Sequence, residues 1–278
     1  IMRLNYKLLV KNLIYVLGFS ATVISFFLTI YNPFSDETLK FRVLLIVLFM
    51  LINIGIAVAI SWPKNKIKIR INNKIKLNVF FGDIFKQKDN IVVIPVNEYF
   101  DTLVDEKVIS SKTLHGLFIK NIFGGDVNSL ERSLTSELSH YKESEMNTSR
   151  KNGKFQKYKI GTTVNIEKDG ISYFLFAFSR FDDANKAECF NVDYQIALKD
   201  LLNYIHENSQ GKEINIPLIG GGQSGVNLTK QKLLEYLIFS IQIHENLTVS
   251  GDINIVLHQN LKEDIDLNKI KSLFMVSD

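Results

Sequence analysis

A glycine-rich stretch carries the clearest chemical signal in this sequence. Residues 216–227 read IPLIGGGQSGVN, so an apolar run leads directly into three glycines, a Gln-Ser pair and a fourth glycine. Glycines let several backbone N–H groups approach one anion, and the start of a following helix adds a favourable dipole. The stretch is neither a Walker loop nor a Rossmann fingerprint. It predicts a phosphate-binding loop, with a strand-to-helix turn that binds no ligand as the alternative.

Two polar residues near the start of the same domain accompany apolar runs. Asp83 follows Phe80-Phe81-Gly82, and Asn97 ends the run IVVIPV at 91–96. A continuous run rich in β-branched residues is typical of a strand buried on both faces. Asp83 and Asn97 are therefore candidate site residues beside a central strand.

Two later segments contain further candidates. The segment SSKTLHG at 110–116 is rich in hydrogen-bond donors, and its His115 is either a general base or ligand contact, or an exposed structural histidine. In FSRFDDANKAECF at 178–190, Arg180 either contacts a phosphate or carboxylate or pairs with Asp182 or Asp183 at the surface. No metal-binding or catalytic set is evident.

The elements around these residues alternate between strands and helices. An alternating pattern around Asn72-Asn73 predicts a β-hairpin, and a central strand follows at 91–96. Apolar periodicity predicts helices at 126–145, 191–207 and 229–244 and strands at 158–166, 172–178, 214–219 and 252–258. The expected fold class is α/β: a mixed β-sheet flanked by helices over 65–278.

The first 64 residues predict a transmembrane hairpin. Two apolar spans, at about 12–31 and 42–62, are each long enough to cross about 30 Å of hydrocarbon. A cleavable signal peptide is the alternative for the first. Basic residues precede the first span and follow the second, so both termini and the α/β domain are expected in the cytoplasm, on the inner membrane.

Small or weakly polar residues recur along one face of each span. They are Gly18, Thr22, Ser25 and Thr29 in the first and Asn53, Ala57 and Ser61 in the second. Such faces pack against other helices, either within one hairpin or between subunits.

Charge and cysteine content limit the binding partners and metal sites that are expected. The net charge of +4 is modest and spread along the chain, so nucleic acid is not an expected partner. Cys189 is the single cysteine, which excludes an intrachain disulfide and a Cys-based zinc site and suits a reducing compartment.

The order of these motifs resembles macro domains. The similarity lies in an apolar strand before Gly82-Asp83-Ile84, a buried strand ending at Asn97, and a late strand running into a glycine-rich loop, and it covers roughly residue 74 onward. Macro domains bind ADP-ribose and related nucleotides. The resemblance implies an ADP-ribose derivative as the ligand and no cofactor.

The resemblance also implies roles for particular residues. Asp83 would accept a hydrogen bond from the adenine amino group, with the Ile84 backbone beside it, and Asn97 would lie near the distal ribose. Ligand discrimination would reside in 100–116 and 178–190, which include Phe100, His115, Gly116 and Arg180. The diphosphate would be wrapped by Gly220, Gly221, Gly222, Gln223, Ser224, Gly225 and Val226.

The paired spans and three segments, including SSKTLHG and DDANKA, look like one macro subgroup: the transmembrane-macro ThsA effectors of bacterial Thoeris antiphage defence. This implies a homo-oligomeric effector that binds a nucleotide made by a TIR-domain protein, possibly histidine-ADP-ribose, and disrupts the membrane in abortive infection.

Two alternatives remain. One is a membrane-tethered ADP-ribosyl hydrolase, although the sequence after Pro95 reads VNEYF where catalytic macro domains have Asn-Ala-Ala-Asn. The other is an anchor whose domain recruits a protein.

Overall fold

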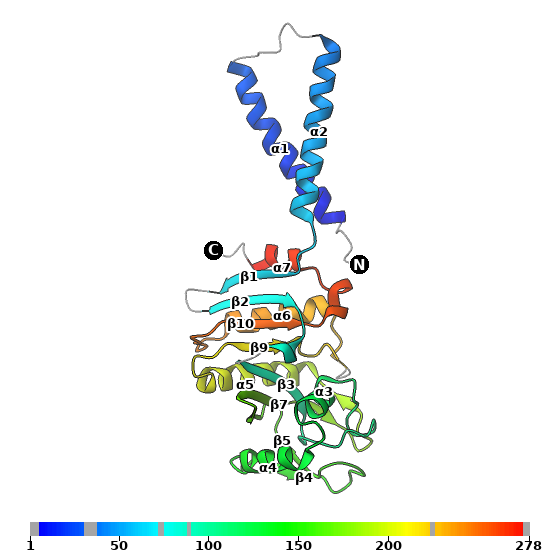
Figure 1. Ribbon diagram of the computed structural model, residues 1–278, viewed down its shortest axis with the longest axis vertical. Coiled ribbons are helices and arrows are strands. Elements are labelled where there is room, and N and C mark those ends of the chain that lie inside the picture. The colour runs from blue at the N-terminus through cyan, green and yellow to red at the C-terminus, as the bar shows by residue number, and fades with distance from the viewer. Residues whose placement is uncertain (1–5, 31–37, 72–74, 88–89, 223–225, 275–278) are drawn as a thin grey trace. The chain divides into compact units, whose positions relative to one another are not determined.

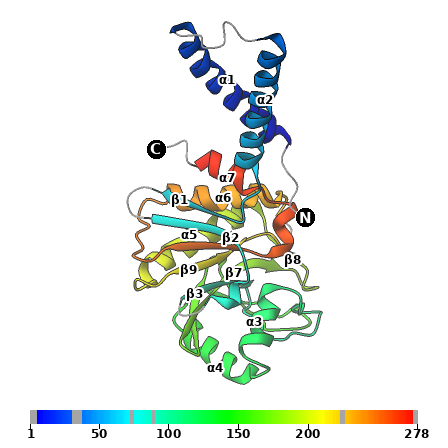
Figure 2. The same ribbon diagram turned by 45° about the horizontal axis from the view of Figure 1, so that its top comes forward.

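The structure is a computed structural model that describes residues 6–30, 38–71, 75–87, 90–222 and 226–274. It divides into two compact units (Figures 1 and 2). The first comprises residues 1–64 with 266–268, and the second comprises 65–265 with 269–278.

The first unit is built on two long helices. Helix α1 spans Tyr6–Ile30 and α2 spans Leu39–Ser61. Both are long and apolar enough to cross a membrane. Helix α2 starts at an N-cap, where the Thr38 hydroxyl accepts a hydrogen bond from the Phe41 backbone N–H at 3.4 Å.

Polar side chains join the two helices. The Ser20 hydroxyl of α1 donates to Asn53 Oδ1 at 2.7 Å, and the Asn12 amide donates to the Ser61 hydroxyl at 2.9 Å. Asn53, Ala57 and Ser61 are the buried residues of α2. The predicted face of α2 therefore packs within the hairpin.

The predicted face of α1 does not. Gly18, Thr22, Ser25 and Thr29 are exposed, and the hydroxyls of Thr22 and Thr29 donate to carbonyls of their own helix, each at 2.8 Å. Of the two alternatives, packing of this face against α2 within the hairpin is wrong, because the contact runs through Asn12 and Ser20 instead.

The second unit is an α/β domain with a mixed sheet, as the sequence predicts. Among the described residues, the main sheet has the order β1-β2-β10-β9-β3-β7-β6, with β8 beside β7 (Figure 1). Strands β1 and β6 lie antiparallel to their neighbours, whereas β2, β10, β9, β3 and β7 run parallel.

The strands are β1 Lys66–Ile71, β2 Ile75–Phe81, β3 Ile91–Asn97, β4 Ser144–Met146, β5 Gln156–Tyr158, β6 Thr163–Lys168, β7 Ile171–Phe181, β8 Ala187–Glu188, β9 Ile214–Pro217 and β10 Ile253–Leu257. The helices are α3 Leu114–Ile122, α4 Val127–Leu138, α5 Asn191–Asn208, α6 Lys230–Ile243 and α7 Leu267–Phe274, with short 3-10 turns η1 Ile84–Lys86 and η2 Gln259–Glu263.

Helices cover both faces of this sheet. In β7, Tyr173, Leu175 and Ala177 belong to one core cluster with residues of α3 and α4. The alternate residues Phe174 and Phe178 meet aromatic rings of α5. This alternation is the two-residue period of a strand buried on both sides.

A row of buried asparagine amides crosses the sheet. Asn78 of β2 donates to Asn254 of β10 at 2.9 Å, and Asn254 donates to Asn215 of β9 at 3.1 Å. Asn215 then donates to the Ile91 carbonyl of β3 at 3.2 Å. A slip of one residue in any strand would turn its amide to the other face, so the row fixes the strand register.

The structure departs from the predicted elements in three places. The helix predicted over 126–145 ends at Leu138, because its apolar face consists of Leu130, Leu134 and Leu138. The strand predicted over 158–166 is divided between β5, which ends at Tyr158, and β6, which begins at Thr163. Helix α3 is not among the predicted helices, and the predicted Asn72-Asn73 turn lies outside the described residues.

The hydrogen bond between Ser20 and Asn53 should stabilise the hairpin. In a double-mutant cycle of Ser20→Ala and Asn53→Ala, we expect a coupling free energy of about 0.6 kcal/mol, with about 1.7 kcal/mol as the upper bound. Unfolding of the full chain in mixed detergent micelles measures it. Thr22→Ala is the matched control, because Thr22 bonds only its own helix. Strict additivity of the two substitutions would contradict this contact.

Candidate functional site

The carboxyl ends of five parallel strands lie at one edge of the sheet. Asp83 follows β2, Asn97 ends β3, Arg180 lies near the end of β7, and Gly220 follows β9. Ligands of parallel α/β sheets bind outside these strand ends. The topology therefore brings the residues predicted at 83, 97, 180 and 220 to the same edge.

Asp83 and Ile84 have different environments. Asp83 is exposed, and its carboxylate caps η1 by accepting the Phe85 backbone N–H at 3.0 Å. The Ile84 side chain is buried in the core cluster that also contains Val92 and Ile94. Asp83 can therefore meet a ligand through its carboxylate, whereas Ile84 can offer only its backbone.

Asn97 is the most informative residue of this edge. It is buried, and its Oδ1 accepts the backbone N–H groups of Tyr99 and Asp101 at 3.0 and 3.4 Å. Its Nδ2 is buried and has no hydrogen-bond partner in the part of the chain that the structure describes. A buried amide without a partner is costly, so a donor here is expected to serve a ligand.

Phe100 lies beneath this turn. Its backbone is left-handed, with φ +49°, and its ring is fully buried, edge-on to Tyr158 at 5.7 Å between centroids. In this structure the ring supports the Asn97 segment from the core.

His115 is buried at the start of α3, so the expectation of an exposed structural histidine is wrong. Burial, together with the smaller effect of the positive charge of Lys154, lowers its pKa to about 3, against the opposing effect of a hydrogen bond to the Asp101 backbone. The imidazole is therefore neutral near pH 7. Gly116, the next residue, has no room for a side chain, because a Cβ there would lie 2.3 Å from the Ser110 carbonyl oxygen.

Arg180 forms a bidentate ion pair with Asp193, in the first turn of α5. Its Nε and one terminal nitrogen donate to the two carboxylate oxygens at 2.7 and 2.9 Å. The predicted alternative of pairing with Asp182 or Asp183 is wrong, because the Asp182 carboxylate caps its own loop at Ala184 and Lys186. The Arg180 side chain is still 45% exposed, so its guanidinium can meet an anion.

The glycine-rich loop is partly described. Gly220 has φ +77°, and a Cβ there would lie 2.9 Å from the Tyr194 ring, so glycine is required. A Cβ at Gly222 would meet open space. Val226 is half-buried, and Gln223, Ser224 and Gly225 lie outside the described residues.

Lys230, which was not predicted as a site residue, lies beside this loop. The Lys230 ammonium donates to the Gly221 carbonyl oxygen, and α6 begins at Lys230. A cation next to a glycine-rich loop is suited to a phosphate group. The available signal in the sequence was its position, a few residues after the last glycine of the loop.

Two buried acids also escaped the sequence analysis. Glu98 follows Asn97; its Oε1 accepts the Phe181 backbone N–H at 3.1 Å, and burial raises the pKa of its carboxyl group. Asp101 forms a buried ion pair with Arg150 at 2.6 Å. In the sequence, both acids follow the buried strand β3 within a few residues, and this position was the available signal for them.

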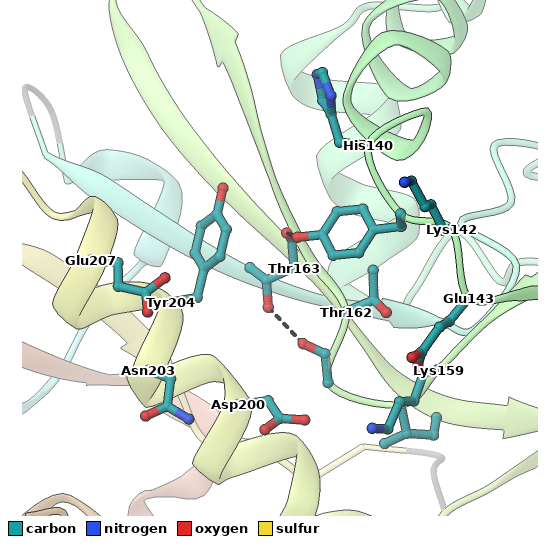
Figure 3. Close-up of a pocket in the computed structure, with 13 residues that line it drawn as sticks. His140, Lys142, Glu143, Lys159, Thr162, Thr163, Asp200, Asn203, Tyr204 and Glu207 are labelled. Atoms are coloured by element: carbon teal, nitrogen blue, oxygen red, sulfur yellow. Dashed lines mark hydrogen bonds between the residues drawn. The ribbon is translucent and has the colours of Figure 1, made fainter. Parts of the chain in front are cut away.

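One cavity lies away from these strand ends. It has a volume of about 480 Å³ and lies between α5 and the segment that leads into β6, with Tyr141, Thr163, Asp200 and Tyr204 in its wall (Figure 3). A second cavity, of about 330 Å³, is lined by residues that include Tyr99 and Lys154. Neither contains a predicted site residue, so the candidate site is defined by the strand ends. Within the described ranges no cluster of three metal-ligating side chains occurs.

Burial of neutral His115 should make the fold sensitive to acid. The unfolded chain binds this proton below about pH 6.5 and the folded chain only below about pH 3, so stability falls as pH falls between them. Thermal unfolding of the full chain should show a loss of about 2 kcal/mol between pH 6.5 and 5 that is absent from His115→Gln. His140→Gln, at an exposed position, controls for the loss of one imidazole. An unchanged slope in His115→Gln would refute this assignment.

Solved structures of macrodomains share this fold. A mutant of the Oceanobacillus iheyensis macrodomain with ADPR is 14% identical, covers 76% of this chain and 99% of its own, and has a TM-score of 0.53. The same macrodomain with MES bound is 14% identical, covers 76% of this chain and 98% of its own, and has a TM-score of 0.52. At this identity the likeness concerns the fold.

The sequence comparisons are more specific. Residues 77–258 match the family described as Thoeris protein ThsA, Macro domain. The curated Thoeris protein ThsA of Bacillus amyloliquefaciens (strain Y2) is 31% identical over 248 residues, which are 83% of this chain and 80% of that protein. The predicted family is confirmed, and the chain belongs to the Thoeris ThsA family that carries a macro domain.

Proposed function

We propose that this chain is an antiphage-defence effector whose macro domain binds an ADP-ribose-derived nucleotide made by a partner TIR-domain protein. Binding favours a homo-oligomer that disrupts the inner membrane and causes abortive infection. The observation that carries the proposal is Asn97, whose buried Nδ2 has no partner among the described residues at the edge where parallel strands end.

Four parts of this edge suit four parts of such a ligand. The exposed Asp83 carboxylate can accept a hydrogen bond from the adenine amino group. The backbone of Gly220 to Gly222, with the Lys230 ammonium beside it, suits the diphosphate. Asn97 Nδ2 can donate to an oxygen of the distal ribose. The half-exposed Arg180 can bind an anionic substituent on that ribose, such as the amino-acid carboxylate of histidine-ADP-ribose.

The relatives support the same ligand class. The curated relative is a Thoeris protein ThsA, and the Oceanobacillus iheyensis macrodomain has a structure with ADPR. Binding without turnover fits the VNEYF segment, which keeps a single asparagine.

In this proposal, helices α1 and α2 carry out the membrane disruption. Two spans cannot enclose a pore, so membrane disruption requires several hairpins. The exposed α1 face of Gly18, Thr22, Ser25 and Thr29 lets helices of other subunits approach closely. The nucleotide can drive assembly only if it binds the assembled state more tightly than the resting state. With both termini cytoplasmic, the macro domain faces the compartment in which the nucleotide is made.

Ligand affinity should depend on the Asp83 carboxylate and the Lys230 ammonium. In titration calorimetry of the full chain in nanodiscs with ADP-ribose, we expect Asp83→Asn and Lys230→Met to weaken binding about ten- to hundredfold. The matched controls are Asp169→Asn, at the turn between β6 and β7, and Lys232→Met, which removes a surface pair with Glu235. Wild-type affinity in both site variants would contradict the proposed ligand pose.

Nucleotide binding should also permeabilise membranes. In liposomes loaded with a self-quenching dye, we expect ADP-ribose or an amino-acid conjugate of it to increase both dye release and chemical cross-linking of the wild-type chain, and to have neither effect on Asp83→Asn. Dye release that is the same with and without the nucleotide would contradict the proposal that nucleotide binding to the macro domain drives membrane disruption by the hairpins. Release of a cleaved product would favour the hydrolase instead.

A further inference from the structure

One arginine of the β4–β5 ribbon is fully enclosed. The Arg150 guanidinium donates to both oxygens of Asp101, at 3.2 and 2.6 Å, and to the Lys154 carbonyl oxygen at 2.6 Å. Its Nε donates to Asn185 Oδ1 at 2.8 Å. Each of its three nitrogens thus has a partner, and the side chain has 0% exposure.

This arginine joins three segments that are far apart in sequence. Its guanidinium carbon lies 3.9 Å from the centroid of the Tyr99 ring and 5.7 Å from that of Phe181. Tyr99 follows β3, Phe181 ends β7, and Arg150 lies between β4 and β5. The Tyr158 backbone N–H of β5 also donates to the Glu98 carbonyl at 2.8 Å. The ribbon is therefore fastened to the turn that follows Asn97.

The ribbon is shaped to hold Asp101. The Lys154 backbone N–H donates to Asp101 Oδ1 at 2.7 Å, in addition to the guanidinium. Gly153 has φ +90°, and a Cβ there would lie 2.6 Å from the same oxygen. Only glycine lets the ribbon approach the carboxylate this closely.

The turn held in this way orients Asn97. The backbone N–H groups of Tyr99 and Asp101 both point at the Asn97 side chain, so its oxygen must face them and its nitrogen must face away. That nitrogen is the buried donor without a partner in the described chain. Its direction depends on the position of residues 99–101, and Arg150 fixes that position.

We infer that Arg150 is a positioning residue for nucleotide binding: by clamping Asp101, it sets Asn97 Nδ2 as a preoriented donor to a ligand oxygen. The inference rests on the proposed function, since it assigns a role at the same edge. A donor whose side-chain orientation is already set avoids part of the ordering cost of binding. A buried ion pair is otherwise a weak source of stability, because apolar residues of similar size often replace it without loss.

The test separates positioning from stability with the double variant Asp101→Leu/Arg150→Met, which removes both charges together. The full chain in nanodiscs is titrated with ADP-ribose, and its thermal unfolding is followed. In chain labelled with 15N-asparagine, the Asn97 side-chain amide signal is identified by its loss in Asn97→Asp. Arg132→Met, at an exposed helix position, is the matched control.

We expect the double variant to unfold within a few degrees of wild type, to bind ADP-ribose at least tenfold more weakly, and to show a shifted or broadened Asn97 amide signal. Arg150→Lys, which keeps the charge but loses the planar fork, should be intermediate. If the double variant does not fold, Arg150→Lys, which keeps both charges of the buried pair, decides the question by its own three- to tenfold loss of affinity. Wild-type affinity or an unchanged Asn97 signal would overturn the inference.

The two proposals fail in different ways. If the wild-type chain does not bind ADP-ribose, the proposed ligand is wrong, and the Asn97 signal alone decides the role of Arg150. A shifted signal in the double variant then supports positioning, and an unchanged signal overturns it.

Discussion

The parallel pairing of β2, β10, β9, β3 and β7 is the constraint on which the candidate site depends. It places Asp83, Asn97, Arg180 and the loop at Gly220 at one edge, although they are far apart in sequence. The buried row of Asn78, Asn254 and Asn215 fixes the strand register, and hence the positions at which the strands end. A register slip would displace the site without removing any of its residues.

Much of this architecture could be predicted from the sequence, because it rests on local patterns. The continuous run at 91–96 indicated a strand buried on both faces, and leucines at every fourth position indicated α4. The two uncharged spans indicated the helices of the hairpin. The glycine-rich loop was also identifiable. A left-handed backbone position such as that of Gly220 favours glycine, so the conformation of the loop is reflected in its residue types.

The remainder depends on contacts between distant segments. Arg150 appeared as one charge in a polar loop, and its burial follows from Asp101, about fifty residues earlier. For His115, an exposed structural position was one of the alternatives, yet the side chain lies buried beside the Asp101 backbone. On α1, residue size indicated one face of the helix, but the contact with α2 is decided by the side-chain hydrogen bonds of Asn12 and Ser20. Such pairings have no signature in one sequence.

The central claim is that the buried amide of Asn97 is a hydrogen-bond donor for an ADP-ribose-type ligand. Its most direct test is calorimetric titration of ADP-ribose into the full chain and into Asn97→Asp, which keeps the shape of the side chain but replaces the donor nitrogen with an acceptor oxygen. We expect saturable binding to the wild-type chain at one site per subunit and at least tenfold weaker binding to the variant. Equal affinity of the two chains, or no binding to either, would contradict it.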